Sequence, residues 1–240
     1  MHNQIKVEFI RLSKSLFFYL TIIAFVILGA MHSYKIVFID KLYFAGGDAF
    51  SSAICDTSLI FIMTMFVSYF IGNEFTYQTI NNEIRVGYSR FSVVVSRAII
   101  VLPASVLPYL AFIMASEVVL VFAHGVSSEL STPILPVLFI LFLLQLVAIQ
   151  SITMFIMFAC KKASLGMMLN IAFSTITCNL LRNWLEEGQY LFKYTSFYRI
   201  QINNILISTQ DIFISFLSAI INLAIMIWLT YLVFKKAELK

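Results

Sequence analysis

The stretch EFTYQTINNEIRVGYSR, residues 74–90, interrupts a chain that is otherwise dominated by long apolar runs. It carries two glutamates and two arginines, and its apolar residues recur at the spacing of a helix. Apolar runs at 52–71 and 98–122 flank it. A segment this polar is not buried in hydrocarbon. We therefore predict that it lies at the membrane surface and presents a face to another protein.

The composition supports a membrane protein. The 240 residues are 61% hydrophobic and only 12% charged, whereas soluble domains have about 25% charged residues. A water-exposed globule of this composition would carry large apolar patches. The net charge of +4 is attributed to lysine and arginine on the cytoplasmic face, and no nucleic-acid partner is expected.

We predict an all-α membrane protein in which residues 1–240 form a single transmembrane domain. Helices that cross a bilayer need about 20 residues each. The apolar runs place six of them at 16–34, 52–71, 98–122, 134–158, 164–181 and 212–234. The fifth is short and contains Asn170 and Asn179, so a tilted or re-entrant element is the alternative there.

Orientation follows from the distribution of lysine and arginine between the loops. With the N-terminus in the cytoplasm, 11 of the 16 Lys and Arg residues fall on the inner side. We therefore expect a multi-pass protein of the cell membrane with both termini cytoplasmic.

Two further segments are not expected to cross the membrane. Residues 1–15 favour an amphipathic helix on the inner surface, and the alternative is a basic flank that only orients the first span. Its apolar positions are Ile5, Phe9, Leu12 and Leu16. The external segment 182–211 is rich in Tyr, Phe and Asn. It favours short interfacial helices before span six, and a plain aromatic belt accounts for the same residues.

The order of residues within 74–90 resembles that of the ABC-2 type permease family, the membrane subunits of ATP-binding cassette exporters. The matching residues are Glu74, Phe75, Thr79, Ile80, Asn82, Gly87, Ser89 and Arg90. The expected topology is similar to that family as well. The resemblance implies that 74–90 forms a cytoplasmic coupling helix, between spans two and three, that docks on an ATPase through these residues and Ile84.

Two positions depart from the family pattern. The family commonly has Gly immediately before the Thr and Lys after the Ile, where this chain has Gln78 and Asn81. Loss of the Gly predicts one continuous helix across 74–86. Loss of the Lys puts in doubt a particular salt bridge to the partner, but not the docking itself.

The resemblance also implies the partners. The sequence contains no G-x-x-x-x-G-K-[ST] motif, so the ATPase is expected to be a separate chain. ATP and Mg would be bound there, and no cofactor is expected in this chain. Six spans are half a transporter, so the implied assembly has ATPase subunits and a second permease chain, identical or related, in a lipid bilayer.

No enzyme or metal site is expected. The sequence offers no Ser-His-Asp candidate, no paired carboxylates on one span and no H-E-x-x-H motif. The cysteines form no C-x-x-C pair and the histidines are scattered, so neither residue type predicts metal ligands.

Four polar residues lie within the predicted spans and need an explanation. They are Glu117, Gln145, Gln150 and Asn222. Glu117 either reaches the external interface, or lines a cavity or pairs with another span. The three amides are expected to bond between helices, with substrate contact as the alternative.

The leading functional hypothesis is a subunit that exports an amphipathic or hydrophobic substrate. Short six-span permeases of this kind resemble those of bacteriocin and lantibiotic self-immunity and of bacitracin resistance, which favours an antimicrobial peptide as cargo over a lipid, drug or ion. The alternatives are a membrane sensor or scaffold that does not transport, and an ion-coupled carrier.

Overall fold

The computed structural model describes residues 2–39, 58–125, 135–184 and 209–236. Over these residues all regular structure is helical and no strand is present, which confirms the predicted all-α class. The elements are α1 His2–Ser13, α2 Leu16–Tyr34, the π-helical turn η1 Lys35–Ile39, α4 Ser58–Thr76, α5 Thr79–Arg85, α6 Arg90–His124, α7 Leu135–Cys160, α8 Ala163–Trp184 and α11 Thr209–Lys235.

Four helices of the described part are long and apolar enough to cross a membrane. They are Leu16–Ile39, Arg90–His124, Pro136–Cys160 and Thr209–Lys235. The helices α4 and α8 coincide with the second and fifth predicted spans but are not among these four, so the count of six stays a prediction. The predicted external helices fall on 182–211, most of which lies outside the described residues.

The third predicted span, 98–122, lies within α6, which runs from Arg90 to His124 as one helix. The helix begins eight residues before the predicted span. Its first turns are capped by the Ser89 side chain, which accepts a hydrogen bond from the Ser92 backbone N–H at 3.1 Å. The longer helix carries Arg97 into the protein interior.

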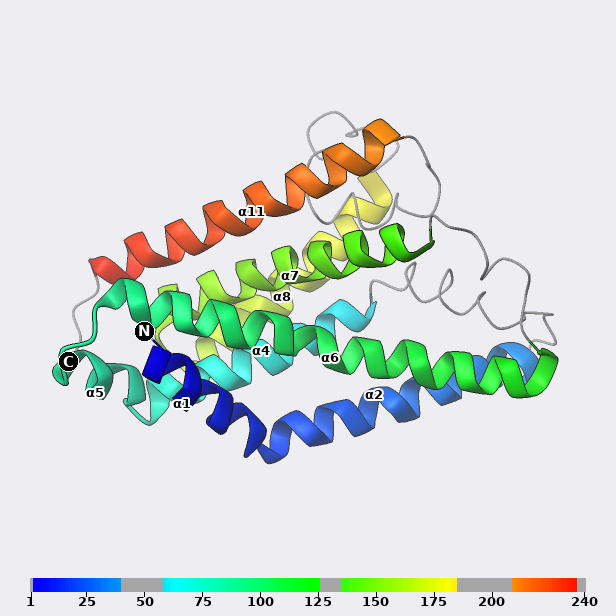
Figure 1. The fold of residues 1–240 in the computed structure, drawn as a ribbon, viewed down its shortest axis with the longest axis horizontal. Coiled ribbons are helices and arrows are strands. Elements are labelled where there is room, and N and C mark those ends of the chain that lie inside the picture. The colour runs from blue at the N-terminus through cyan, green and yellow to red at the C-terminus, as the bar shows by residue number, and fades with distance from the viewer. Residues whose placement is uncertain (1, 40–57, 126–134, 185–208, 237–240) are drawn as a thin grey trace.

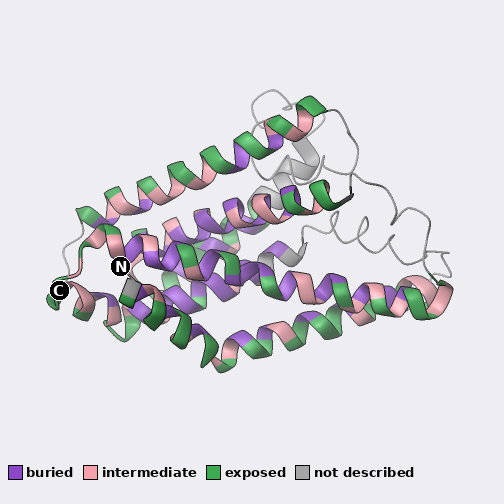
Figure 2. Cartoon of the chain, viewed as in Figure 1, coloured by how far each residue is buried: buried purple, intermediate pink, exposed green. Residues whose placement is uncertain are grey.

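Helix α6 lies at the centre of the molecule and contacts α1, α2, α4, α7 and α11. Figure 1 shows α2 and α11 on opposite sides of it, with α4, α7 and α8 behind. Buried residues concentrate on α4, α6 and α7, while α2 and α11 expose much of their length (Figure 2). Because the exposed side chains of these two outer helices are largely apolar, lipid or a second membrane chain suits them better than water.

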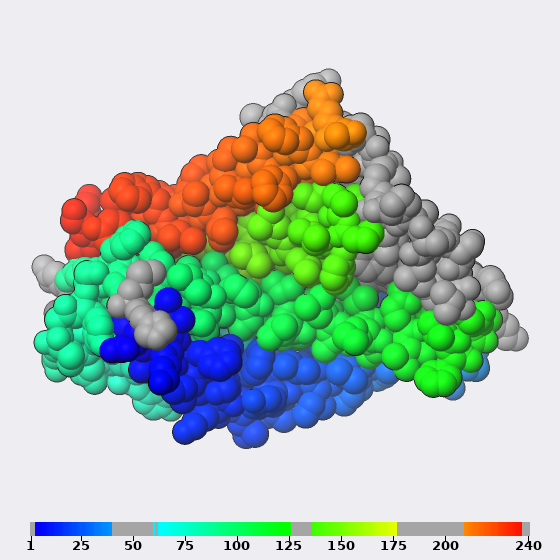
Figure 3. All heavy atoms as spheres, viewed as in Figure 1, coloured from blue at the N-terminus to red at the C-terminus, as the bar shows by residue number. Residues whose placement is uncertain are grey.

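Helices α2 and α6 approach closely at Gly29, and Figure 3 shows their atoms in contact over one face of the molecule. A Cβ atom at Gly29 would collide with the backbone carbonyl oxygen of Phe112. In the same place the Ser116 hydroxyl donates a hydrogen bond to the Gly29 carbonyl at 2.9 Å. Glycine is therefore required here for space rather than for backbone freedom.

Polar side chains join α4, α7 and α8 in the interior. The Asn170 amide donates to the Ser68 hydroxyl at 2.9 Å and to the Thr153 carbonyl at 3.3 Å. The Ser174 and Thr64 hydroxyls lie 3.3 Å apart. Asn170, the residue that made the fifth span doubtful, thus packs between helices, as amides within membranes commonly do.

One end of the molecule carries α1, α5, the first residue of α6 and the last residue of α11 (Figure 1). We call this the α5 end. The opposite end, which we call the η1 end, carries η1 and the last residue of α6. Residues far apart in the sequence therefore meet at the α5 end.

Candidate functional site

The segment between α4 and α6 is not one helix, so the prediction of a continuous helix across 74–86 is wrong. Helix α4 ends at Thr76 and α5 begins at Thr79. Between them Gln78 adopts a left-handed conformation with φ of 56°. This is the position at which the family commonly has glycine, and the break turns the chain away from the α4 axis at a cost of about 1–2 kcal/mol for a residue with a Cβ.

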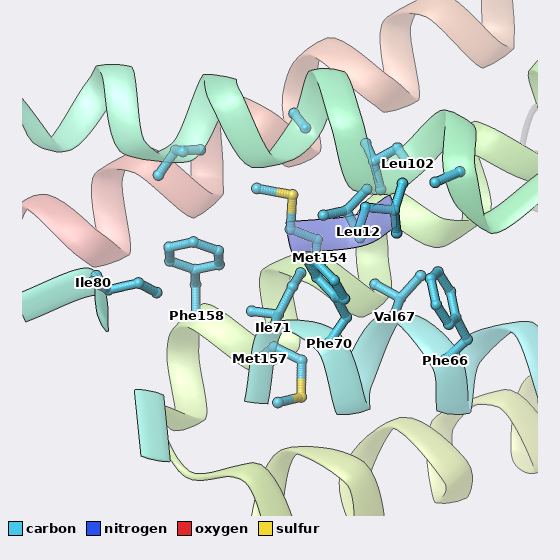
Figure 4. Packing of buried hydrophobic residues seen from close by; sticks show 14 of the residues in the cluster. Leu12, Phe66, Val67, Phe70, Ile71, Ile80, Leu102, Met154, Met157 and Phe158 are labelled. Atoms are coloured by element: carbon cyan, nitrogen blue, oxygen red, sulfur yellow. The ribbon is translucent and has the colours of Figure 1, made fainter. Parts of the chain in front are cut away.

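Helix α5 is held against the bundle by its apolar side. Ile80 is fully buried, and Ile84 packs against the same hydrophobic cluster. Figure 4 shows Ile80 near Phe158 of α7, within a cluster that also receives side chains from α1, α4 and α6. The Phe75 ring meets Phe158 edge-on, with 5.3 Å between ring centroids. A short helix that is marginal on its own is thereby fixed in place.

Five charged residues meet beneath α5, and we call them the Arg97 cluster: Glu8 and Arg11 of α1, Glu74 of α4, Glu83 of α5, and Arg97 of α6. The Arg97 side chain is 0% exposed. Its Nε lies 2.9 Å from Glu74 Oε2, and its Nη2 lies 2.5 Å from Glu83 Oε1 and 3.0 Å from Glu8 Oε1. One guanidinium therefore binds carboxylates from three other helices.

The contact with Glu83 is bidentate, because Arg97 Nη1 also donates to Glu83 Oε2 at 2.7 Å. Paired N–H donors fix the direction of a carboxylate as well as its distance. Removing one partner of a buried ion pair typically costs about 3–5 kcal/mol, since the other charge is left uncompensated. Helix α5 is thus bound to α6 by a geometry that only arginine provides.

Helix α1 joins this cluster through its polar side. Arg11 Nη2 approaches Glu74 Oε1 to 3.1 Å, and its guanidinium lies over the Phe70 ring, 5.2 Å from the centroid. Gln4 Nε2 lies 3.5 Å from Glu83 Oε2 and its Oε1 accepts a hydrogen bond from the Ser92 hydroxyl. The buried residues of α1 are Gln4, Glu8 and Leu12, so the face that contacts the protein is partly polar and partly apolar. The predicted stripe residues Phe9 and Leu16 are exposed.

The Arg97 cluster holds three carboxylates and two guanidinium groups, a formal charge of −1 when all are ionised. Among these carboxylates Glu8 has a raised pKa, and its side chain is 1% exposed. Burial, and after it the neighbouring carboxylates Glu74 and Glu83, raise the pKa of Glu8 against the opposing effect of Arg97 and Arg11, and the net result is a pKa of about 7. Near neutral pH the Glu8 carboxyl therefore exchanges between its two protonation states.

A second arginine ties the end of this segment to the last helix. Arg90 Nη1 donates to the carbonyls of Phe234 and Lys235, each at 2.7 Å. Its guanidinium also lies over the Phe234 ring, 5.6 Å from the centroid. The last carbonyls of a helix have no partner within it, so Arg90 caps α11 from the start of α6.

The Arg97 cluster and α5 lie in the part of the chain that a known family matches, whereas the end of α11 lies beyond it. The model of the ABC-2 family transporter proteins matches residues 4–178, which is 175 of the 240 residues. This chain belongs to that family. No curated protein and no solved structure matches it. Membership makes the chain an ABC-2 permease, a transmembrane component that works with an ATP-binding cassette ATPase.

The permease buries several of the residues predicted to dock on the ATPase. Glu74 and Ile80 are buried; Phe75, Thr79, Ile84 and Arg90 are partly buried; Asn82, Gly87 and Ser89 are exposed. Exposed side chains on the same segment include Tyr77 at 75% and Val86 at 78%. We define the α5 face by its exposed side chains: Tyr77, Gln78, Asn82, Arg85 and Val86.

The four polar residues predicted within the spans of the permease occupy different environments. Gln145 Nε2 donates to the Ser215 carbonyl at 2.7 Å and lies 3.2 Å from the Ser218 hydroxyl, so it joins α7 to α11. Gln150 is buried, and its amide has no hydrogen-bond partner among the described residues. Glu117 on α6 and Asn222 on α11 are partly exposed.

Sequence reasoning missed Gln4, Glu8 and Arg97. Arg97 was counted only as a charge that orients the chain, because the third span was begun one residue after it. Its setting, with apolar Val93–Val95 before it and Ala98–Leu102 after it, was an available signal, since an arginine inside an apolar run needs a partner. Among the residues that the structure describes, no group of His, Cys, Asp and Glu is arranged to hold a metal.

Proposed function

We propose that this permease is the membrane-spanning half of an ATP-binding cassette exporter, and that its α5 face docks on the ATPase. The observation that carries the proposal is the Arg97 cluster. A docking helix transmits force only if it is bound rigidly to the spans. Here Glu83 of α5 shares one buried guanidinium with Glu8 of α1 and Glu74 of α4.

The contacts of α5 connect a movement of this helix to the membrane helices. Displacement of α5 would act on α6 through Arg97 and on α1 and α4 through their carboxylates. Through Arg90 it would act on α11, which is joined to α7 by Gln145. Each step of this connection is an ion pair between side chains or a hydrogen bond from a side chain to a backbone carbonyl.

The proposed assembly follows from the family and the exposed surfaces. Two ATPase subunits would hold ATP and Mg, and no cofactor would bind this chain. A second permease chain, identical or related, would cover part of the apolar surface of α2 or α11. The α5 end and both termini would lie in the cytoplasm of the cell, because the cationic side chains gather there.

The docking proposal is tested by recovery of the ATPase with the tagged permease from native membranes in mild detergent. Val86→Asp adds a charge at the exposed centre of the α5 face. Phe122→Asp is the matched control, because Phe122 is 88% exposed but lies near the η1 end of α6. We expect ATPase recovery to fall at least about tenfold with Val86→Asp and to be unchanged with Phe122→Asp.

Each alternative gives a different result. If the wild type recovers no ATPase, the exporter proposal fails. If Val86→Asp and the wild type recover the same amount, docking does not use the α5 face. If the ATPase is recovered but no substrate ever depends on its ATP hydrolysis, the chain is a sensor or scaffold.

For the cargo we propose an amphipathic or hydrophobic molecule, with an antimicrobial peptide preferred on the family resemblance. The test is growth of a deletion strain, with and without the restored permease, against peptide antibiotics and against small hydrophobic drugs. Protection against peptides that is lost in an ATPase-dead strain supports an immunity or resistance role. Protection against small drugs alone would replace the peptide with a drug as cargo.

A further inference from the structure

A cavity opens at the η1 end, away from the α5 face. Its volume is about 870 Å³, within the range of about 300–1,000 Å³ that small-molecule sites occupy. Its apolar lining comes from three elements and includes Leu28, Met31, Ile62, Phe112 and Val119. Three side chains of the lining carry polar groups: His32, Tyr34 and Lys35.

The walls of the cavity are set by the packing of α2 on α6. Gly29 allows the α2 backbone to touch Phe112, and the Ser116 hydroxyl holds the Gly29 carbonyl at 2.9 Å. After this contact α2 continues to Tyr34 and is followed by the π-helical turn η1, Lys35–Ile39. Such turns carry wider backbone spacing and are frequent at functional sites. The cavity thus lies beside the junction between the closely packed α2–α6 pair and the π-helical turn η1.

The positive charge of the cavity comes from Lys35. Lys35 begins η1 and its side chain is exposed, so its ammonium reaches the surface while its stem stays beside apolar groups. The His32 ring lies 5.8 Å from the Phe112 ring, and its Nε2 is buried, so His32 contributes a ring to the wall.

From this geometry we infer that the cavity at the η1 end binds an anionic membrane lipid. One acyl chain lies along the apolar wall, and the negatively charged headgroup meets the ammonium group of Lys35. An apolar wall with a cationic rim matches a molecule that has a long apolar body and one anionic end. The lining residues that the structure describes include no carboxylate, so nothing in them repels such a headgroup.

This inference does not rest on the proposed export function, because lipid binding needs neither ATP nor the ATPase. With the termini in the cytoplasm, the cavity faces the outer leaflet. A lipid held there would contact both α2 and α6, the pair whose α6 member is bound to α5 at the other end. Its removal is expected to leave ATPase recovery through the α5 face unchanged.

The test is native mass spectrometry of the full chain in detergent micelles with two probes that share one acyl chain. The probes are palmitoyl-lysophosphatidylglycerol, which is anionic, and palmitoyl-lysophosphatidylcholine, which is zwitterionic. We expect the wild type to bind the anionic probe at least about fivefold more tightly, the effect of one cation near a charged headgroup. Lys35→Gln is expected to abolish that preference, and Lys14→Gln at the α5 end to preserve it.

A substitution that fills the cavity gives a second, independent test. Val119→Trp places a large ring on the apolar wall and is expected to reduce binding of both probes about tenfold or more, while the thermal melting temperature stays near that of the wild type. Met168→Trp, on the exposed side of α8, is the control and is expected to bind like the wild type. Equal binding of both probes by the wild type, or equal binding by the two Trp variants, overturns the inference.

Discussion

Gln78 adopts a backbone conformation that glycine adopts at lower cost, and this defines a prediction at the scale of one residue. Its φ of 56° brings the Cβ atom too close to the following carbonyl. We expect Gln78→Gly to stabilise the protein by about 1 kcal/mol, because relief of this clash exceeds the added entropy of an unfolded glycine. Thermal melting in detergent measures the change.

The control for this prediction is Gln78→Ala, which keeps a Cβ at the same position. It should not raise the melting temperature. If Ala and Gly raise it equally, the side chain of Gln78 rather than its backbone conformation is the source of the strain.

Glu8 gives the protein a stability that depends on pH. The pKa of this carboxyl is raised from 4.5 to about 7 in the folded protein, so the folded state holds the proton more tightly than the unfolded state. The stabilisation is fully present below pH 4.5 and is lost as the pH rises through about 7. Over that window the loss is about 3 kcal/mol at most.

We expect the melting temperature of the detergent-solubilised wild type to fall between pH 5 and pH 8, and Glu8→Gln to flatten much of that fall. Glu117→Gln, far along α6 from the cluster, should retain the wild-type slope. The groups that face Glu8 are Arg11, Glu74, Glu83 and Arg97. A slope unchanged by Glu8→Gln would show that another member of this group binds the proton.

At the scale of elements, the glycines at helix contacts differ in what they touch. A Cβ at Gly29 would collide with the backbone of Phe112, which cannot move without shifting α6. A Cβ at Gly166 would meet the end of the Met157 side chain, which can change rotamer. We expect Gly29→Ala to destabilise the protein by about 2 kcal/mol and Gly166→Ala by less.

Melting temperatures of the two variants check this order. If Gly166→Ala is the more damaging change, the turn between α7 and α8 is packed more rigidly than the α2–α6 contact. Both substitutions add the same methyl group, so the difference between their melting temperatures reports how the surroundings of each glycine respond.

The helices themselves were accessible from the sequence because apolar runs of this length leave few other conformations in a membrane. The run 16–34, for example, coincides with α2 Leu16–Tyr34. The start of α6 could not be predicted in the same way, because the sequence does not distinguish the buried Arg97 from a surface charge until its partners are known. Glu8 lies 89 positions before it, and no local pattern joins them.

The candidate site was predicted in its location but not in its contacts. The segment 74–90 was identified because it is polar between apolar runs. Which of its side chains point inward depends on the break at Gln78 and on the position of α1. Helical periodicity predicts that Phe9 lies on a stripe of α1 that faces the membrane, and Phe9 is exposed. The packing of Gln4 and Glu8 against the protein was not predictable, because their partners on α6 lie far along the chain.

At the scale of the whole molecule, the gathering of α1, α5 and the last residue of α11 at one end (Figure 1) predicts a labelling pattern. In a background where Cys55, Cys160 and Cys178 are replaced by Ser, a membrane-impermeant maleimide on intact cells should label Lys35→Cys. Arg85→Cys should react only after permeabilisation. Both side chains are exposed, so burial does not explain a difference.

Labelling of Arg85→Cys in intact cells, without labelling of Lys35→Cys, would show the opposite orientation. The α5 face would then lie outside the cell, where it could not contact the ATPase. Labelling of both positions in intact cells would place the segment between α4 and α6 on the outer surface together with η1. The first result would keep the fold and reverse its sides, whereas the second would contradict a fold in which α6 crosses the membrane between these two ends.

The order of residues in the Arg97 cluster has a consequence for biosynthesis. Glu8, Glu74 and Glu83 leave the ribosome before Arg97, and until then Arg11 is the only arginine of the cluster that has been made. Burying the surplus carboxylates at that stage would be costly. We therefore expect the first helices to enter the bilayer with their α5 ends open and hydrated. Arrival of α6 would supply Arg97 and allow the carboxylates to be buried.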